Sequence, residues 1–541
     1  MAEKITYSND KRLNNLLNSV VDEVKDYSGE VADRIKKLSE IGIALSSEHN
    51  LNKLLEMIVD EAREFTNADG GTLYILKDDQ LNFQIIQNAS LDIRLTGESG
   101  ELQKFAPLAL DKSNVSAYVA LERKAVNIAD VYKTDEFDFT GPKKFDKQSG
   151  YRCQSMLVVP MTNYEDEVIG VLQLINAKDI DSSEVTTFSD EFVELTQSLA
   201  SQAGVAITNV QLIADIENLF ESFIKVMATA IDERTPYNVN HTRRVVEFAG
   251  LLAREVNEST DGVFKDTSFS DDELNELRIA SWMHDVGKVT TPEWVMDKST
   301  KLQKIFDRIE LIIERFNNIK KDLIIKSKDE KIAALSNGTA DKAALDKIDA
   351  ALNEKLDELN KDYEAVIRAN KPGEFMQDDD IANIKAIAAK AYIDHNGDEQ
   401  PFLTEDEVVN LTIRKGSITN DERKIMQNHA TVSLKMLNNI PFTKKLKNVP
   451  KYASAHHECI NGSGYPLGLK DDEISIQSRI MAIADFFEAL TAPDRPYKKA
   501  LPIEVALSIL TKVVDNNELD KDLFELFVNN KVYEKNAKGL I

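Results

Sequence analysis

An eleven-residue segment, residues 456–466, constrains this chain more than any other; it reads HHECINGSGYP. Its two adjacent imidazoles can direct two nitrogen ligands toward neighbouring points, and the carboxylate of Glu458 can bind a metal or hold an imidazole in place. The glycines of the segment permit positive φ, and Pro466 fixes φ, so backbone can approach a ligand closely. The segment therefore predicts a rigid turn beside a metal site, with a pair of core histidines before a surface turn as the alternative.

The distribution of histidines favours the metal site. The chain has only seven histidines. Five of them fall in patterned segments from residue 241 onward: His241, His284, His429, His456 and His457.

Carboxylates and a lysine accompany these histidines. Asp285 follows His284 directly and could bridge two ions, and Asp485 follows an apolar helical stretch and could add a last ligand. Lys288 lies four residues after His284, so on a continuous helix it would point into the same pocket.

Taken together and in this order, the motifs of the C-terminal part resemble the HD-GYP family of metal-dependent phosphodiesterases. The resemblance rests on residues 232–237 and 241–245, on 284–288, on His429, on the 456–466 signature, on Asp485 and on 495–498. It implies hydrolysis of cyclic di-GMP, or of a related cyclic dinucleotide, at a cluster of two or three iron or manganese ions. Tyr237 occupies the place where some relatives carry a further acidic ligand, which favours two divalent ions here.

The resemblance also implies roles for individual residues. One ion would be held by His241, His284, Asp285 and Asp485, and Asp285 would bridge to a second ion held by His429, His456 and His457. Adjacent residues of a helix point about 100° apart, which would let each neighbouring pair serve two ions. Asp285 and Lys288 are the expected catalytic residues. The expected substrate contacts are Lys288, Gly464, Tyr465, Pro466, Arg495 and Lys498.

Length, composition and charge limit the classes of protein to which the chain can belong. A chain of 541 residues exceeds one hydrophobic core, so several domains are expected. Its formal charge of -26 repels nucleic acid polymers, and no apolar run is long enough to span a membrane. Two cysteines and no signal-peptide core at the N-terminus indicate a cytoplasmic protein.

The sequence predicts a multidomain α+β protein with a sensor domain in its N-terminal part. Residues 1–48 form a helical segment whose apolar stripe, from Leu13 to Leu38, could pack within the chain or pair with a second copy. Residues 49–212 alternate helices and strands, with a helix at 51–65, a turn at 68–71 and later strands. This segment resembles a GAF domain, an antiparallel sheet with flanking helices. Asn176, Lys178 and Phe188 loosely echo a cyclic-nucleotide signature, but the ligand is unknown.

A long helix, residues 192–227, connects the sensor to an all-α HD-GYP domain at 213–541. It is a candidate signalling helix, with a purely structural linker as the alternative. His284 and His429 lie 145 positions apart, far more than in compact relatives. Two apolar stripes on either side of residues 337–338 predict that residues 300–414 are an inserted antiparallel helical hairpin.

These observations lead to one functional hypothesis and its competitors. The chain is expected to hydrolyse cyclic di-GMP to pGpG or GMP under control of the GAF sensor. The competitors are a phosphodiesterase preferring the mixed dinucleotide cyclic GMP-AMP, a catalytically silent cyclic-dinucleotide receptor, and another HD hydrolase of nucleotides. The expected partners are a second copy of the chain, paired through the N-terminal and linker helices, and a protein that binds the inserted hairpin.

Overall fold

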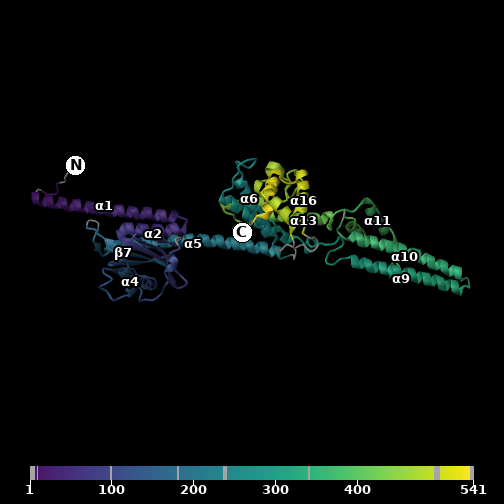
Figure 1. Ribbon diagram of the computed structural model, residues 1–541, viewed down its shortest axis with the longest axis horizontal. Coiled ribbons are helices and arrows are strands. Elements are labelled where there is room, and N and C mark those ends of the chain that lie inside the picture. The colour runs from purple at the N-terminus through teal and green to yellow at the C-terminus, as the bar shows by residue number, and fades with distance from the viewer. Residues whose placement is uncertain are drawn as a thin grey trace. The chain divides into compact units, whose positions relative to one another are not determined.

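The computed structural model describes residues 6–8, 10–97, 100–179, 182–234, 240–338, 341–373, 375–492 and 500–535. The chain forms two compact units, Met1–Phe220 and Glu221–Ile541 (Figure 1). Among the described residues, no helix has the length and apolar character needed to cross a bilayer. The cytoplasmic location stays a prediction.

The first unit is built on one antiparallel sheet with the strand order β3-β2-β1-β7-β6-β5, to which β4 and β8 add short edges. Its elements are α1 (Lys11–Ser47), α2 (Leu51–Thr66), β1 (Ala68–Lys77), β2 (Gln80–Asn88), β3 (Ile93–Thr96), η2 (Leu102–Lys104), β4 (Leu108–Ala109), α3 (Val115–Glu122), β5 (Val126–Ile128), α4 (Thr140–Ser149), β6 (Met156–Thr162), β7 (Val168–Lys178), β8 (Val185–Thr186) and α5 (Asp190–Asp232). One core joins α2, the end of α1 and the start of α5 to the sheet, and α3 contributes to a second core. The predicted sheet with flanking helices is confirmed.

The predicted turn at residues 68–71 is wrong, because these residues open strand β1. Gly70 pairs with Asn88 on one side and with Ile175 on the other. A Cβ on Gly71 would lie 2.8 Å from Cγ1 of Val59, so α2 packs directly on the strand here. The glycines serve close packing rather than chain reversal.

Helix α1 matches its predicted span but buries only part of its apolar stripe. Leu38, Ile41 and Leu45 near its C-terminal end belong to the core of the first unit. Toward the N-terminus, Leu16 and Val24 are 62% and 57% exposed. Packing within the chain therefore accounts for one end of the stripe only.

The residues that echo a cyclic-nucleotide signature make structural contacts. The Asn176 side chain accepts a hydrogen bond from the backbone N–H of Gln154 and donates one to the carbonyl of Arg152, each 2.7 to 2.8 Å long. Lys178 pairs with the buried Asp69, and Phe188 is 2% exposed in the core. These contacts join strands and helices of the sensor fold.

The second unit is mostly helical, as predicted, apart from one small hairpin of two strands. It takes up the end of α5 and continues with α6 (His241–Glu258), α7 (Asp271–Met283), η3 (Val286–Thr290), α8 (Glu293–Met296), α9 (Ile309–Ser336), α10 (Lys342–Asn370), α11 (Asp378–Ala388), β9 (Ala391–Ile393), β10 (Glu399–Pro401), α12 (Glu405–Leu411), α13 (Asn420–Leu437), η4 (Lys444–Leu446), α14 (Val449–Ser454), η5 (Asp471–Glu473), α15 (Ile476–Thr491), α16 (Ile503–Asp515), α17 (Lys521–Asn529) and η6 (Val532–Glu534).

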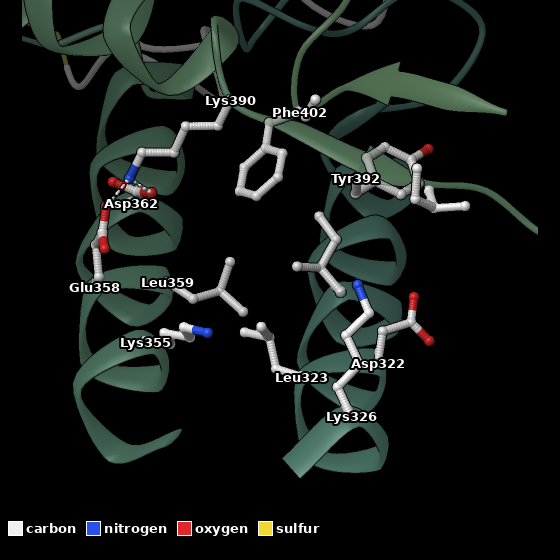
Figure 2. A pocket seen from close by; sticks show the side chains of 13 residues that line it. Asp322, Leu323, Lys326, Lys355, Glu358, Leu359, Asp362, Lys390, Tyr392 and Phe402 are labelled. Carbon is white, nitrogen blue, oxygen red and sulfur yellow. Dashed lines mark hydrogen bonds and ion pairs between the residues drawn. The ribbon is translucent and has the colours of Figure 1, made fainter. Parts of the chain in front are cut away.

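Helices α9 and α10 form the predicted antiparallel hairpin and lie side by side (Figure 1). Phe316 and Val366 share a core near its base, and Lys331 pairs with Asp349 near its tip, 2.5 Å apart. Beyond the prediction, α11, α12 and the β9–β10 hairpin pack on the base of these helices. A pocket of about 200 Å³ lies between α9, α10 and β9, and Lys390 closes one side of it by pairing with two carboxylates of α10 (Figure 2).

Two buried lysines, Lys298 and Lys301, join the two ends of the predicted insertion, and we call this junction its neck. The Lys298 side chain is fully buried, and its Nζ lies 2.8 Å from both carboxylate oxygens of Glu422 and from Oδ1 of Asn410. Lys301 donates to the backbone carbonyls of Leu411 and Ile413 at 3.1 and 2.7 Å. Glu422 lies in the first turn of α13, so the neck positions that helix directly after the long insertion.

Replacing Lys298 by methionine should destabilise the second unit by about 3 to 5 kcal/mol, because it leaves the Glu422 carboxylate buried without its cation. Urea unfolding followed by tryptophan fluorescence measures this, since Trp282 and Trp294 are the only tryptophans and both belong to the second unit. Lys304, 43% exposed in its pair with Asp406, provides the control substitution to methionine. Equal effects at both lysines would contradict the proposed role of the neck.

Candidate metal centre

Five helices and two turns bring the seven predicted ligands together. His241 is the first residue of α6, and His284 directly follows the end of α7. His429 lies within α13, and Asp485 lies within α15. The adjacent histidines His456 and His457 occupy the turn after α14, and Asp285 precedes the 3-10 turn η3. All of these positions except His457 and Asp485 are buried.

Backbone carbonyls fix the orientation of three of the imidazoles. Nδ1 lies 2.7 Å from the Ser281 carbonyl oxygen in His284, 2.6 Å from that of Met426 in His429, and 2.6 Å from that of Ala453 in His456. A carbonyl can only accept, so each Nδ1 carries a proton, and in the neutral ring Nε2 keeps its lone pair. Every one of these rings therefore presents a metal-binding atom on its far side.

These lone pairs converge on Asp285. Nε2 of His284 lies 3.0 Å from Oδ2 of Asp285, and Nε2 of His429 lies 3.5 Å from Oδ1. Nε2 of His241 lies 3.3 Å from Oδ2 of Asp285 and 3.4 Å from Oδ1 of Asp485. The two oxygens of one carboxylate thus face different histidines, which is the arrangement expected of a bridging ligand.

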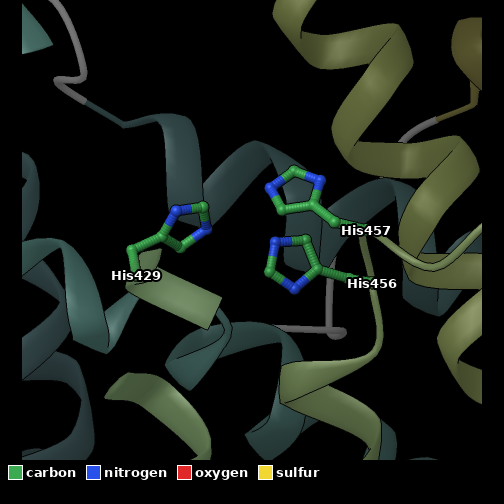
Figure 3. A group of neighbouring side chains, drawn as sticks. All are labelled: His429, His456 and His457. Atoms are coloured by element: carbon green, nitrogen blue, oxygen red, sulfur yellow. The ribbon is translucent and has the colours of Figure 1, made fainter. Parts of the chain in front are cut away.

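The donor atoms fall into groups of the size that a metal ion requires. Within the described residues, ligand atoms of His241, His284 and Asp485 lie within 4.8 Å of one another, and so do those of His429, His456 and His457 (Figure 3). Asp285 joins His284 and His456 in a third such group. The Nε2 atoms of four of these histidines are buried without a hydrogen-bond partner in the described part of the chain. Buried polar atoms left in this way fit cation ligands, and mixed imidazole and carboxylate donors suit iron or manganese.

The prediction that each adjacent ligand pair lies on a helix is wrong. Helix α7 ends at Met283, so His284 and Asp285 lie at its end, and His456 with His457 lies beyond α14. Lys288 reaches the centre through η3 rather than along an α-helical face, and its Nζ lies 2.6 Å from Oδ2 of Asp285. Both ligand pairs therefore lie in turns that follow helices, and the rings of His456 and His457 lie 4.0 Å apart.

A glycine and a serine hold the Asp285 turn against α13. A Cβ on Gly287 would lie 2.0 Å from the carbonyl oxygen of His429, so only glycine permits this approach. The Ser433 hydroxyl accepts a hydrogen bond from the Gly287 N–H and donates one to the carbonyl of His284, both 2.9 Å long. This contact fixes Asp285 relative to His429.

Within the part of the chain that the structure describes, Glu458 belongs to none of these ligand groups and contacts backbone instead of an imidazole. Its carboxylate accepts hydrogen bonds from the backbone N–H groups of Leu467 and Leu469, at 2.7 and 2.9 Å. It thereby shapes the turn that carries Gly464, Tyr465 and Pro466, in which the Tyr465–Pro466 peptide bond is cis. The Tyr465 ring packs 4.8 Å from that of His457, so the turn forms a wall beside the centre.

Glu488 is a functional residue that the sequence analysis missed. Its carboxylate binds Nδ1 of His241 and also accepts a 2.8 Å hydrogen bond from Nε of Arg244. A carboxylate on Nδ1 orients the ring and raises the basicity of its other nitrogen. The available signal was its position one helical turn after Asp485, on the same face of α15.

Burial and charge divide the histidines into two sets. Burial lowers the pKa of His429, lowers that of His456 well below its usual range, and lowers that of His457 to about 4. Burial also acts on His241, but Asp285 and Glu488 outweigh it and raise that pKa to about 9. In His284, the charges of Asp285 and Asp485 likewise outweigh burial and raise the pKa. The first three imidazoles are therefore neutral at pH 7, whereas cation binding at His241 would displace a proton.

Four further residues were considered in the sequence analysis. Arg495, Lys498 and Tyr237 lie outside the described residues. Asp232, considered as a ligand or a structural group, accepts hydrogen bonds from the backbone and hydroxyl of Thr242 at 3.2 and 2.8 Å. It caps the beginning of α6 and so helps to place His241.

Comparison with protein families agrees with this two-part organisation. Residues 50–207 match the GAF domain, and residues 238–365 and 405–523 match two HD domain models. The chain therefore carries a GAF domain followed by an HD region, as the sequence predicts. The exact domain boundaries, including those of the insertion, stay predictions.

Curated relatives share short segments with this chain. It is 41% identical over 98 residues to 3'3'-cGAMP-specific phosphodiesterase 3 of Vibrio cholerae, which is 18% of this chain and 20% of the relative. It is 36% identical over 117 residues to 3'3'-cGAMP-specific phosphodiesterase 1 of the same organism, covering 22% and 26%. It is 40% identical over 98 residues to a cyclic di-GMP phosphodiesterase of Thermotoga maritima, covering 18% and 26%. The chain thus spans about a fifth to a quarter of the length of these relatives.

Replacing Glu488 by glutamine should lower metal affinity about 10- to 100-fold, because His241 loses the carboxylate that orients it. Titration of metal-free full-length protein with Mn²⁺, followed by calorimetry, measures the change. Glu525→Gln on α17 is the matched control, since that carboxylate is 56% exposed and pairs only loosely with Lys521. An unaltered affinity in Glu488→Gln would show that this carboxylate does not support the centre.

Proposed function

We propose that this protein is a metal-dependent phosphodiesterase of the HD-GYP type that hydrolyses a cyclic dinucleotide under the control of its GAF domain. The observation that carries the proposal is a set of four buried Nε2 atoms without a hydrogen-bond partner among the described residues, three of which lie 3.0 to 3.5 Å from the Asp285 carboxylate. A core packed only for stability would satisfy those atoms.

The ligand assignment follows the two groups of donors. His241, His284 and Asp485 would hold one divalent cation, His429, His456 and His457 a second, and Asp285 would bridge them. Two such cations would supply activation of water and of the phosphoryl group. Iron and manganese are the proposed metals, because the donor set combines imidazoles with carboxylates.

Side chains around the centre would position the substrate. Lys288 is 18% exposed and its ammonium lies at the edge of the cluster, where it can bind a non-bridging phosphate oxygen. The turn at Gly464, Tyr465 and Pro466 would form one wall of the substrate site. Arg495 and Lys498 remain proposed contacts to guanine or to the second phosphate.

Cyclic di-GMP is the proposed substrate, with pGpG or GMP as the product. A mixed cyclic GMP-AMP is the second candidate, because two of the relatives are named for specificity toward 3'3'-cGAMP. Both substrates present the same phosphodiester linkage to the centre, so discrimination would depend on contacts to the base.

The GAF domain offers a cavity for a regulatory ligand. The cavity has a volume of about 540 Å³, is lined largely by aromatic and apolar side chains, and includes Gln87. The Gln87 side chain is buried, and its Nε2 has no partner among the described residues. Helix α5 connects this domain covalently to the HD region. The hairpin α9–α10 is the proposed site of a protein partner.

Metal-loaded protein should convert cyclic di-GMP to linear products, resolved by anaerobic incubation with Fe²⁺ or Mn²⁺ followed by chromatography. His429→Ala should lower the rate at least about a thousandfold, since it removes a ligand from a centre that supplies several kcal/mol of transition-state stabilisation. His395→Ala is the matched control, because His395 is exposed in the turn between β9 and β10.

A parallel incubation with 3'3'-cGAMP decides the substrate. A higher kcat/KM for the mixed dinucleotide would favour the second candidate. Binding of either nucleotide with no turnover under both metals would contradict the phosphodiesterase and leave a receptor.

A further inference from the structure

An arginine just beyond helix α5 contacts the turn that carries Lys288. Arg234 lies two residues after the end of α5 and is half-buried. Its Nη1 donates a 2.7 Å hydrogen bond to the carbonyl of Lys288, and the same nitrogen donates to the carbonyl of Val289. Both carbonyls belong to the 3-10 turn η3, so a single guanidinium holds the end of this turn.

The local sequence explains why η3 needs a donor from elsewhere in the chain. In a 3-10 helix each carbonyl accepts from the N–H three residues later. The N–H of Thr291 reaches the Lys288 carbonyl in this way, at 3.0 Å. The residue three positions after Val289 is Pro292, which has no N–H. Carbonyls at a helix end that lack a backbone donor take one from a side chain, a ligand or water. Arg234 provides the donor that the proline cannot.

Both ends of η3 are therefore tied to other parts of the second unit. At its beginning, the Gly287 N–H donates to the Ser433 hydroxyl of α13 at 2.9 Å. At its end, Arg234 donates to the two carbonyls. Lys288 lies between these ties, and its Nζ is 2.6 Å from Oδ2 of Asp285. A lysine side chain is a flexible four-carbon stem, so the position of its ammonium depends on how its backbone is held.

The end of α5 is itself fixed within the second unit. Glu221 pairs with Arg278 of α7 at 2.7 Å, and Ile231 is 9% exposed. Asp232 accepts hydrogen bonds from the backbone and the hydroxyl of Thr242 at 3.2 and 2.8 Å. The guanidinium therefore extends from a backbone that is held in place, as a positioning group requires.

We propose that Arg234 is a positioning residue that acts through Lys288. By tying the end of η3, it keeps the Lys288 ammonium beside Asp285, where that cation can bind a non-bridging oxygen of the scissile phosphate. Negative charge on the phosphoryl oxygens develops in the transition state, so a well-placed cation stabilises that state more than it stabilises the bound substrate. This role rests on the proposed phosphodiesterase function.

A double-mutant cycle tests the role in full-length, Mn²⁺-loaded protein, with the cyclic dinucleotide that the parent chain hydrolyses faster. Arg234→Met should lower kcat about a hundredfold and leave KM within about threefold, because the misplaced cation is missed mainly in the transition state. In a Lys288→Met background the same substitution should lower kcat by less than about threefold, since the group through which it acts is gone. Arg254→Met, at an exposed position of α6, is the matched control and should keep the parent kinetics.

Hydrogen exchange of the metal-free, full-length chain gives a readout that does not depend on activity. Peptides covering residues 284–292 should exchange about 10- to 100-fold faster in Arg234→Met, because the turn loses hydrogen bonds from a charged donor. Peptides from the α9–α10 hairpin should exchange as in the parent chain, which shows that the variant is folded.

Each component of the proposal can fail separately. Unchanged exchange of residues 284–292 in Arg234→Met would overturn the tie. A hundredfold loss that persists in the Lys288→Met background would show that the arginine does not act through the lysine. An active parent chain with unchanged kinetics in Arg234→Met would overturn the positioning role alone, whereas a parent chain that hydrolyses no cyclic dinucleotide would overturn the proposed function on which the role rests.

Discussion

The candidate metal centre depends on a short hydrogen bond repeated in three histidines. In His284, His429 and His456, Nδ1 binds the carbonyl of the residue three positions earlier. This local bond keeps a proton on Nδ1 and leaves Nε2 buried within the cluster of candidate ligands. The rest of the second unit then has to bring five helices and two turns to one carboxylate. The close contact of Gly287 with α13 holds the Asp285 turn against that helix. The Glu458 carboxylate fixes the neighbouring turn by accepting a hydrogen bond from the N–H of Leu467.

The insertion explains how distant residues can meet. The predicted insertion, residues 300–414, separates His284 from His429, two of the candidate ligands, and most of it forms the hairpin of α9 and α10. Lys298 and Lys301 close the neck by binding Glu422 and the end of α12. Because loop-closure entropy grows only slowly with loop length, a long insertion is tolerated when its ends are fastened.

The sequence predicted much of this arrangement. Apolar periodicity located α1, α2, α5 and the hairpin, because long amphipathic helices repeat their signal over many turns. The histidine motifs identified the seven side chains that the structure gathers. Their backbone was predicted less well, since His284 and His456 lie just past helix ends, where periodicity carries no signal. Gly70 was misread as part of a turn because glycine also marks close packing within strands. Glu488 escaped notice because a lone glutamate on an apolar helix has no motif of its own.

The central claim is that seven side chains hold two cations bridged by Asp285, and metal stoichiometry tests it most directly. Anaerobically purified protein, analysed by elemental mass spectrometry, should contain about two iron or manganese ions per chain. Asp285→Asn should retain no more than one, because both positions lose a shared ligand. Parent protein without bound transition metal after loading, or Asp285→Asn with the full complement, would contradict the account.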